Sequence, residues 1–538
     1  MKRTYFLLLS VLLLAGCKSH HYTLQSLQPH RIEVTKALDA HPSAEAEAFL
    51  APFRKSVDSL RTPYIGQSEM YMTGGRPESL LSNWVADALV AAGRRMGYEP
   101  DLGVCNIGGL RAALPKDTVR CGDILSISPF ENFFTILKMR GSDVQQLMQD
   151  IAAVHGEGVS SSARLVITRD GKLKSASISD KPINPEGIYT IATLDYLAEG
   201  NDKLYAFKRA IECIVTKEPI RETLMTHLRL LNQQGLKATS KIEGRITVAN
   251  EGELPKKMQQ VESDARESLI QIQNQPYSAT KNLMIVHTND THSCIEPLSP
   301  LLSDTAQADK GGYLRRAALV RDLRKYSPGL LLLLDCGDFS QGSAYYSLYH
   351  GDVEVGLMNL MGYDAATVGN HEFDFGLENM ARIFRLAKFP IVCCNYDFTG
   401  TPVEGLVKPY LIIKRVGVKI GILGVSPQLE GLVAAHTCEG VRFTDPIAAA
   451  QPIADYLRNE AKCDLVICLS HLGWQVAGIS DEEFIAATRN IDLVLGGHSH
   501  TYFTCPQVLQ NADKKNVPDN QMGKNGRYVG TLSLKLTR

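Results

Sequence analysis

The second half of the chain repeats one pattern, an apolar and often β-branched run that ends in a polar cluster. The runs are LMIVHTND, LLLLLDCGD, DAATVGNHE, DLVICLSH and IDLVLGGHSH. Continuous apolar runs predict strands that are buried on both faces. Helical segments separate them, at residues 314–326, 351–363, 377–388 and 445–461. This alternation predicts a layered α/β domain over residues 281–538, with functional side chains on the loops at the strand ends.

The rest of the chain predicts a second domain with a different organisation. A chain of 538 residues is too long for a single core. Residues 33–250 combine helical segments at 78–97 and 141–156 with closely spaced strands and turn residues, which predicts an α+β domain with a mixed or antiparallel sheet. Residues 18–32 are polar and predict a tether. Residues 251–280 are polar and helix-favouring and predict a helical linker between the domains.

Charge and cysteine content exclude some classes of function. The formal net charge is −1 and neither half is strongly basic, so binding to nucleic acid has no support. The 12 cysteines include no C-x-x-C pair, which argues against a thiolate zinc site. Cys336, Cys463 and Cys468 lie in or beside predicted strands, and we expect them to be small core residues.

The N-terminus has the pattern of a targeting segment. Lys2 and Arg3 precede an apolar run over residues 5–14, which is shorter than the roughly 20 residues that span a bilayer. The small residues before Cys17 resemble the bacterial lipobox. This resemblance implies a signal peptide over residues 1–17, acylation of Cys17, and an exported, membrane-anchored lipoprotein in the periplasm or at the cell surface. An ordinary signal peptide with a chance cysteine is the alternative.

The polar clusters at the strand ends supply oxygen and nitrogen ligands for metal ions. Asp338 is a carboxylate able to bridge two cations, and Asn370 offers a neutral carbonyl oxygen. Such a set without thiolate suits zinc, manganese, iron, cobalt or nickel. Each cluster alone would be an ordinary turn or core feature, but the whole series predicts a two-metal site, which points to hydrolysis of a phosphate ester. The candidate ligands are Asp290, His292, Asp338, Asn370, His471, His498 and His500.

This series resembles the calcineurin-like metallophosphoesterases, and the strings VHTNDTHS and VGNHEFDFG are similar to their 5′-nucleotidase branch. The resemblance implies a four-layer α/β/β/α domain and two divalent ions (zinc, manganese, cobalt, iron or magnesium). It implies that one ion is held by Asp290, His292, Asp338 and His500. The other would be held by Asp338, Asn370, His471 and His498.

The same resemblance gives His371 a catalytic role instead of a ligand role. It implies that His371 contacts the phosphoryl group and stabilises the transition state, with Asp374 as its partner. A nearby carboxylate would hold the imidazole protonated and oriented. From the residues alone, a cap on the helix that follows Asp374 is an equal alternative.

Three segments of the first domain resemble the 5′-nucleotidase substrate domain, namely NIGGLR, PFEN and DYLAEGND. The resemblance implies that Phe130 and Tyr196 sandwich the base, a geometry that aromatic faces favour. Asn132 would meet the base edge and Asp202 the ribose hydroxyls. Asn106 and Arg111 would hold the ribose or phosphate end, and Arg76 is a further candidate for phosphate contact. Without the resemblance, these segments would be structural turns.

Two departures from the family pattern affect the first domain. Tyr196 replaces the usual Phe, and Gly200-Asn201-Asp202-Lys203 replaces Gly-Gly-Asp-Gly, which puts the position of Asp202 in question. The order of the domains is also reversed, because the family places the metal domain first. The half-sites would then meet within one chain or between two chains.

The resemblance implies a metal-dependent hydrolase that cleaves the phosphate monoester of nucleoside 5′-phosphates. A phosphodiesterase of 2′,3′-cyclic nucleotides, or a hydrolase of nucleotide sugars or nucleoside diphosphates, would have the same metal site. A nucleotide-binding lipoprotein without turnover and a hydrolase of a non-nucleotide substrate are further alternatives.

Overall fold

The apolar runs of the second half are strands of two packed sheets. The structure is a computed structural model and describes residues 21–252, 270–272, 279–300 and 306–538. An eight-stranded sheet has the order β13 (Ile270–Gln271), β1 (Thr23–Glu33), β27 (Tyr528–Thr537), β14 (Thr280–Thr288), β15 (Leu331–Asp335), β16 (Ala365–Thr367), β17 (Ile391–Val392) and β19 (Val407–Lys408). A six-stranded sheet has the order β20 (Tyr410–Arg415), β21 (Val418–Val425), β23 (Leu465–Ser470), β24 (Leu493–Leu495), β26 (Asn516–Asn520) and β25 (Gln507–Gln510).

Helices cover the outer face of each sheet. Leucine and isoleucine side chains from both sheets, such as Ile285 and Ile467, fill the space between the sheets. Helices α8 (Tyr313–Tyr326), α10 (Asp352–Met361) and α11 (Gly376–Leu386) pack on the first sheet. Helices α12 (Pro446–Asn459) and α13 (Asp481–Ala487) pack on the second. The expected four layers are confirmed, and we call this body the metal domain.

Strand β1 overturns the prediction of a tether over residues 18–32. It pairs antiparallel with β27, from Thr23 opposite Thr537 to Glu33 opposite Tyr528. A register shift between Leu24 and Ser26 lets Leu24 and Leu27 enter the same core between the sheets. The sequence did not reveal the strand because this bulge breaks the alternation of apolar and polar residues.

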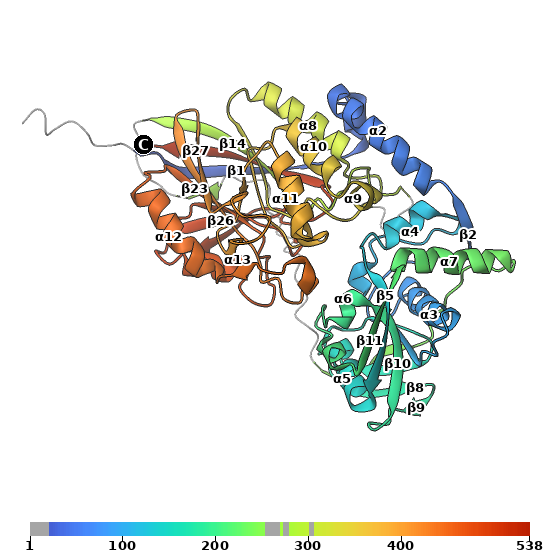
Figure 1. The fold of residues 1–538 in the computed structure, drawn as a ribbon. Coiled ribbons are helices and arrows are strands. Elements are labelled where there is room, and N and C mark those ends of the chain that lie inside the picture. Colours follow the sequence, from blue (N-terminus) through green and yellow to red (C-terminus); the bar gives the residue numbers. More distant parts are fainter. Residues whose placement is uncertain (1–20, 253–269, 273–278, 301–305) are drawn as a thin grey trace, which may run out of the picture.

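The predicted domain boundary at residue 33 is also wrong. Helix α2 (Ala44–Arg61) buries Ala46, Leu50 and Val57 in the metal domain, beside α8 and α10. Its first turn is capped by Ser43, whose side chain accepts a hydrogen bond from the Ala46 N–H. Figure 1 shows α2 in blue at the upper body and β2 (Tyr64–Ser68) leading into the lower body. The chain therefore passes into the first domain between α2 and β2.

The helical linker predicted for residues 251–280 lies mostly outside the described residues. Within that range, Ile270–Gln271 forms β13 and pairs with β1. The metal domain is thus built from two separate stretches of the chain, one before and one after the first domain.

The first domain, called the substrate domain below, has the expected mixed sheet. Its five-stranded sheet has the order β11 (Glu212–Pro219), β5 (Phe133–Arg140), β10 (Ile188–Leu194), β3 (Leu102–Cys105) and β6 (Gly158–Val159), in which β10 and β3 are parallel. A smaller sheet contains β12 (Ile246–Val248), β7 (Ala163–Ile167), β8 (Leu173–Ile178) and β9 (Lys181–Pro182). Strand β2 pairs with β4 (Asp117–Arg120).

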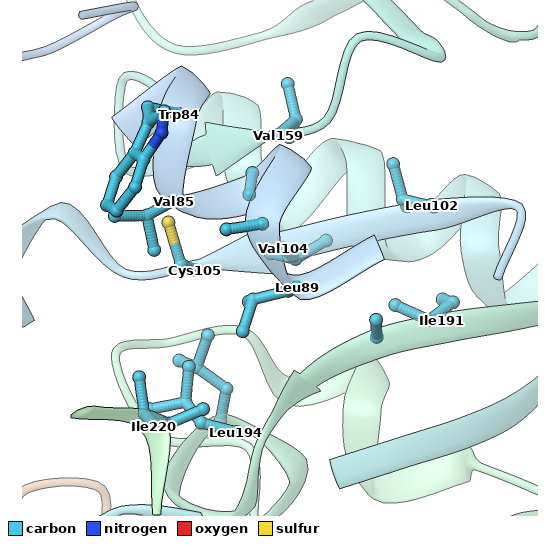
Figure 2. Close-up of a cluster of buried hydrophobic side chains, with 14 of the residues drawn as sticks. Trp84, Val85, Leu89, Leu102, Val104, Cys105, Val159, Ile191, Leu194 and Ile220 are labelled. Carbon is cyan, nitrogen blue, oxygen red and sulfur yellow. The ribbon is translucent and has the colours of Figure 1, made fainter. Parts of the chain in front are cut away.

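Helices α3 (Leu80–Arg95), α5 (Gly141–Ala153) and α7 (Ile220–Gln233) complete the substrate domain. Figure 2 shows Trp84 and Leu89 of α3 in one cluster with Val104 and Ile191 of the sheet. The helix approaches β3 very closely, because a Cβ on Gly103 would lie 2.3 Å from the Ala86 carbonyl oxygen.

Two further expectations concern the chain as a whole. The cysteines of the described residues are unpaired, and Cys336, Cys463 and Cys468 are buried, as expected for core residues. No helix within the described ranges has the length and apolar character needed to cross a membrane.

Candidate active site

The structure brings all the predicted metal ligands to one edge of the metal domain. Asp290 and His292 follow β14, Asp338 follows β15 and Asn370 follows β16 of the first sheet. His471 directly follows β23, and the two histidines at 498 and 500 follow β24 of the second sheet. Parallel strands end at the same edge of a sheet, so side chains distant in sequence meet there.

Left-handed backbone turns aim several ligands back toward the centre. The φ angles are 47° at Asp290, 44° at His292, 55° at Asp338, 67° at His498 and 56° at His500. This region is rarely populated by residues other than glycine. Such strain is maintained where the surrounding structure holds it, and it concentrates at functional sites.

The first group of ligands converges on a point between two imidazoles. The Nε2 atoms of His292 and His500 are 2.8 Å apart. Asp290 Oδ1 lies 3.6 Å from His500 Nε2 and 3.9 Å from His292 Nε2. Asp338 Oδ2 lies 4.0 Å from His292 Nε2. These four side chains are those that the family resemblance assigns to one ion.

The second group shares Asp338. Its Oδ2 lies 3.2 Å from His471 Nε2, and His498 Nδ1 lies 3.0 Å from Asn370 Oδ1. The Nδ1 atom of His471 is 2.7 Å from the Cys336 carbonyl oxygen, and this contact fixes the ring with Nε2 toward the site. Asp338 therefore faces both groups, as a bridging carboxylate must.

The chemistry of this donor set fits two divalent cations. Burial raises the pKa of Asp290 to about 7 and lowers the pKa of His498 to about 3. The buried His471 Nε2 makes no hydrogen bond within the described part of the chain, although it faces a carboxylate. Buried carboxylates and open imidazole nitrogens are costly without a partner, and a cation would satisfy both. The absence of thiolate from the set matches the sequence prediction.

Two glycines make room for the ligands. A Cβ on Gly369 would lie 2.2 Å from Asp338 Oδ1. A Cβ on Gly497 would lie 2.9 Å from His471 Nδ1 and 3.1 Å from Asp290 Oδ2. Any side chain at either position would displace a ligand.

His371 pairs with a carboxylate at one ring nitrogen and lies near a guanidinium at the other. Its Nδ1 lies 2.9 Å from Asp374 Oδ2, and its Nε2 lies 3.5 Å from Arg111 Nη2 of the substrate domain. Burial opposes protonation of His371, but Asp374 and Asp338 outweigh it and raise the pKa of the imidazole. His371 also lies close enough to His292 and Asp338 to join a metal group by distance alone. Its pairing with Asp374 instead favours the predicted catalytic role.

Asp374 pairs with His371 and does not cap the following helix. Helix α11 begins after Phe375, and no side chain of the described residues caps its first turn. The alternative that the sequence left open is thereby resolved in favour of pairing.

Glu372 is a supporting residue that sequence reasoning did not single out. Its fully buried carboxylate accepts hydrogen bonds from the backbone N–H groups of Asp338 at 3.0 Å, Ser340 at 3.1 Å and Gly369 at 2.6 Å. It therefore ties together two of the ligand loops. The only signal in the sequence is its position directly after His371.

A cavity of about 330 Å³ lies between the two domains and reaches the metal ligands. The metal domain contributes Asp338, Asn370, His371, Asp374, His498 and His500. The substrate domain contributes Asn106, Arg111, Phe130, Asn132, Tyr196 and Asp202. All but one of the predicted substrate-binding residues thus line the cavity.

The loop that departs from the family pattern still holds Asp202 firmly. Asp202 adopts a φ of 55° and accepts hydrogen bonds from Asn106 Nδ2 at 2.7 Å and from the Tyr196 hydroxyl at 3.0 Å. The hydroxyl that distinguishes Tyr196 from phenylalanine therefore fixes this carboxylate.

Arg111 lies over the aromatic part of the cavity. Its guanidinium carbon is 5.2 Å from the centre of the Phe130 ring. The Phe130 ring is in turn 5.8 Å from the His371 ring.

Arg76 is not among the described residues that line the cavity, in contrast to the predicted phosphate contact. Its guanidinium pairs with the buried carboxylate of Glu157 and donates to the Gly156 carbonyl oxygen at 2.8 Å. Glu157 also accepts from the Ile107 N–H. Arg76 therefore stabilises the turn beside Asn106 indirectly, through Glu157.

One side of the cavity carried no signal in the sequence. Residues 429–438 of the metal domain, called the pocket wall below, follow β21. They contribute Leu432, Val433, Ala434, His436 and Thr437 to the lining.

Comparison with known families matches both domains. Residues 64–209 match the family of the 5′-nucleotidase C-terminal domain. Residues 283–502 match the calcineurin-like phosphoesterase family. The first of these domains is named for a C-terminal position but here precedes the other, so the predicted reversal of order is confirmed.

Individual relatives match about half of the chain. The 5′-nucleotidase of Rattus norvegicus is 32% identical over 279 residues, which cover 48% of this chain and 47% of the rat protein. The apyrase of Tabanus yao is 32% identical over 273 residues, with coverage of 47% and 48%. The solved structure of a 5′-nucleotidase precursor from Thermus thermophilus has a TM-score of 0.42 and 31% identity, covering 47% of this chain and 51% of that chain. The chain thus spans about half the length of the curated relatives it matches.

Proposed function

We propose that this chain, in which a domain of the 5′-nucleotidase C-terminal family precedes a domain of the calcineurin-like phosphoesterase family, is a metal-dependent hydrolase of nucleoside 5′-phosphates. It would release the nucleoside and inorganic phosphate.

One contact between the domains carries the proposal. Arg111 of the substrate domain reaches within 3.5 Å of His371 of the metal domain, beside the ligand cluster. A guanidinium and a protonated imidazole repel each other unless an anion lies between them, and a phosphate oxygen can accept hydrogen bonds from both. The same cavity contains the aromatic pair Phe130 and Tyr196. One site would thereby accommodate a phosphate and a planar base.

The side chains of the cavity would have separate roles. Phe130 and Tyr196 would hold the base by stacking, and Asp202 would accept hydrogen bonds from the ribose hydroxyls. Arg111 and His371 would donate to the phosphoryl oxygens and stabilise the charge that develops there. Asp374 would keep His371 oriented and protonated.

The two groups of ligands would hold divalent cations, with Asp338 between them. When bound, such ions polarise phosphoryl oxygens and lower the pKa of water. The ligand set suits zinc, manganese, cobalt or iron, and magnesium is a further candidate.

The test is phosphate release from a panel of nucleotides by protein reconstituted with manganese, cobalt or zinc. We expect release from nucleoside 5′-monophosphates by the wild type and a loss of at least about 100-fold in Asp338→Asn and His371→Ala. Cyclic nucleotides and nucleotide sugars belong in the panel, because preferred cleavage of either would replace the proposed substrate. If the wild type releases no phosphate with any of these metals, the proposal that it is an enzyme is refuted.

Phe130→Ala tests whether the substrate carries a base. We expect it to lower kcat/KM for nucleotides about 10-fold or more, since stacking on one aromatic side chain contributes roughly 1–3 kcal/mol. Turnover of p-nitrophenyl phosphate should change little. Equal turnover of nucleotides by variant and wild type would indicate a substrate without a base.

Export and lipid anchoring are a second part of the proposal. Cys17 lies outside the described residues, and its support is the run of basic, apolar and small residues that precedes it. Metabolic labelling with a fatty acid should mark the wild type in the membrane fraction and should fail to mark Cys17→Ala. A labelled variant or a wild type without label would refute it.

A further inference from the structure

The pocket wall docks on the helix that presents Tyr196. That helix, α6 (Asp195–Ala198), is followed by Glu199. The Ala435 N–H of the wall donates a hydrogen bond of 2.9 Å to Glu199 Oε2. The wall is therefore held beside the helix that carries Tyr196, and five of its residues line the same cavity as Tyr196.

A second pair of contacts surrounds this hydrogen bond. His436 Nδ1 lies 3.7 Å from Glu199 Oε1, and Lys208 Nζ lies 3.7 Å from Glu430 Oε1. Gly200 makes the approach of Lys208 possible, because a Cβ there would lie 2.8 Å from Lys208 Cγ. The substrate domain thus places a carboxylate beside the His436 imidazole and a lysine beside the Glu430 carboxylate of the wall.

Glu199 caps a short helix of the metal domain that has no side-chain cap from the described residues of the metal domain itself. Residues Ala435–Thr437 form a short 3-10 helix whose preceding residue, Ala434, cannot cap it. The first N–H groups of such a helix have no partner inside it. Glu199 supplies that partner from the other domain, with the added strength of a charged acceptor.

The remaining contacts contribute less. The side chains of His436 and Glu430 are 70% and 74% exposed, and exposed ion pairs stabilise little. Leu429 and Val433 are buried in the core of the metal domain, so the base of the wall stays with that domain. The hydrogen bond to Glu199 has the shortest distance of these three contacts and the best-defined geometry, so it is the contact to test first.

We propose that the pocket wall is a specificity element that closes the nucleoside part of the cavity, and that Glu199 is the positioning residue that latches it to α6. The inference rests on the proposed function. It predicts that substrates with a base depend on the latch. A small aryl phosphate, which reaches the metal ligands without filling the nucleoside part, should not depend on it.

Steady-state kinetics of three variants test the latch. Glu199→Ala should lower kcat/KM for a nucleoside 5′-monophosphate about three- to tenfold, mainly through KM, and should leave turnover of p-nitrophenyl phosphate unchanged. Glu199→Gln keeps an oxygen for the Ala435 N–H and should retain most of the activity. Glu212→Ala is the matched control, because Glu212 is a 45% exposed carboxylate that pairs with Lys138 within the substrate domain.

Two kinetic results would overturn the inference. One is unchanged nucleotide kinetics in Glu199→Ala. The other is an equal loss on both substrates, which would show a general effect on the fold.

Hydrogen exchange of the Ala435 amide provides a readout that does not need activity. Exchange should be faster in Glu199→Ala than in the wild type and in Glu212→Ala, because the amide loses its acceptor. Equal exchange in all three proteins would overturn the latch even if nucleotides are hydrolysed. Faster exchange in a protein that hydrolyses no nucleotide would leave the latch standing and refute the proposed substrate.

Discussion

Replacing Asp374 by alanine tests the least direct of the assigned roles. The Asp374 carboxylate lies 2.9 Å from His371 Nδ1, and the two side chains are only 18% and 15% exposed. A charge-assisted hydrogen bond with this degree of burial contributes about 1.5–3 kcal/mol. If this hydrogen-bond energy acts entirely in the transition state, kcat/KM of Asp374→Ala should be about 10- to 150-fold lower than that of the wild type. About 1.4 kcal/mol corresponds to a factor of ten.

A double-mutant cycle separates this role from a structural one. Asp374 has no assigned contact with substrate, so it should act only through His371. In a His371→Ala background, Asp374→Ala should therefore cost almost nothing further, and the coupling energy should equal the single-mutant effect. The assay is phosphate release from a nucleoside 5′-monophosphate at saturating metal, with circular dichroism as the check on folding.

Two results would refute the reasoning about Asp374. Additive losses in the double variant would mean that Asp374 acts independently of His371. A comparable loss in Glu378→Ala, which removes an exposed carboxylate from the first turn of α11, would point to a general effect of charge on that helix.

Three further predictions concern stability. Chelation of the divalent ions should lower the melting temperature of the wild type but not that of Asp338→Asn. Ions present at about 100 times their Kd stabilise the folded state by about 2.7 kcal/mol. Equal shifts of the melting temperature in both proteins would contradict the ligand assignment. Burial lowers the pKa of His287 to about 3, whereas the unfolded residue gains its proton near pH 6.5. The free energy of unfolding of the metal-free protein should therefore fall by about 1.4 kcal/mol per pH unit through His287 as the pH falls from about 6 to about 4. Urea titrations of His287→Asn should show a shallower fall of the unfolding free energy with pH. Parallel pH curves for variant and wild type would contradict this prediction. Leu27→Ala should lower the free energy of unfolding, measured with urea, by about 2–5 kcal/mol, because Leu27 is fully buried in β1. A substitution at the exposed Gln28 should lower it by less than about 0.5 kcal/mol. Equally small effects of both substitutions would contradict the placement of β1.

The metal cluster could be predicted from the sequence because its information is local. Each ligand lies within a few residues of the end of an apolar strand, as His471 does after β23 and Asp338 after β15. Once these runs are recognised as parallel strands, the shared edge of the sheet brings their ends together. The motif resemblance then divided the ligands into two groups that agree with the distances around Asp338.

The parts that could not be predicted depend on partners that the local sequence does not specify. Strand β1 pairs with residues at the other end of the chain, and its bulge hides the apolar alternation. The charge of Arg76 was visible, but its buried partner Glu157 was not. The pocket wall has an ordinary composition, and it gains its role only from the position of Glu199 in the other domain.

The pairing of β1 with β27 has a consequence for the order of folding. Thr23 and Thr537 meet across a sequence separation of 514 residues, whereas the strands of the substrate domain all lie between β2 and β12. Contacts this distant form late, and domains fold as units while the chain is synthesised. The substrate domain can therefore finish folding on the ribosome, while the edge of β1 that pairs with β27 stays open until β27 is made. Such an edge can pair with other chains, so we expect chaperones to bind β1 until β27 has been synthesised.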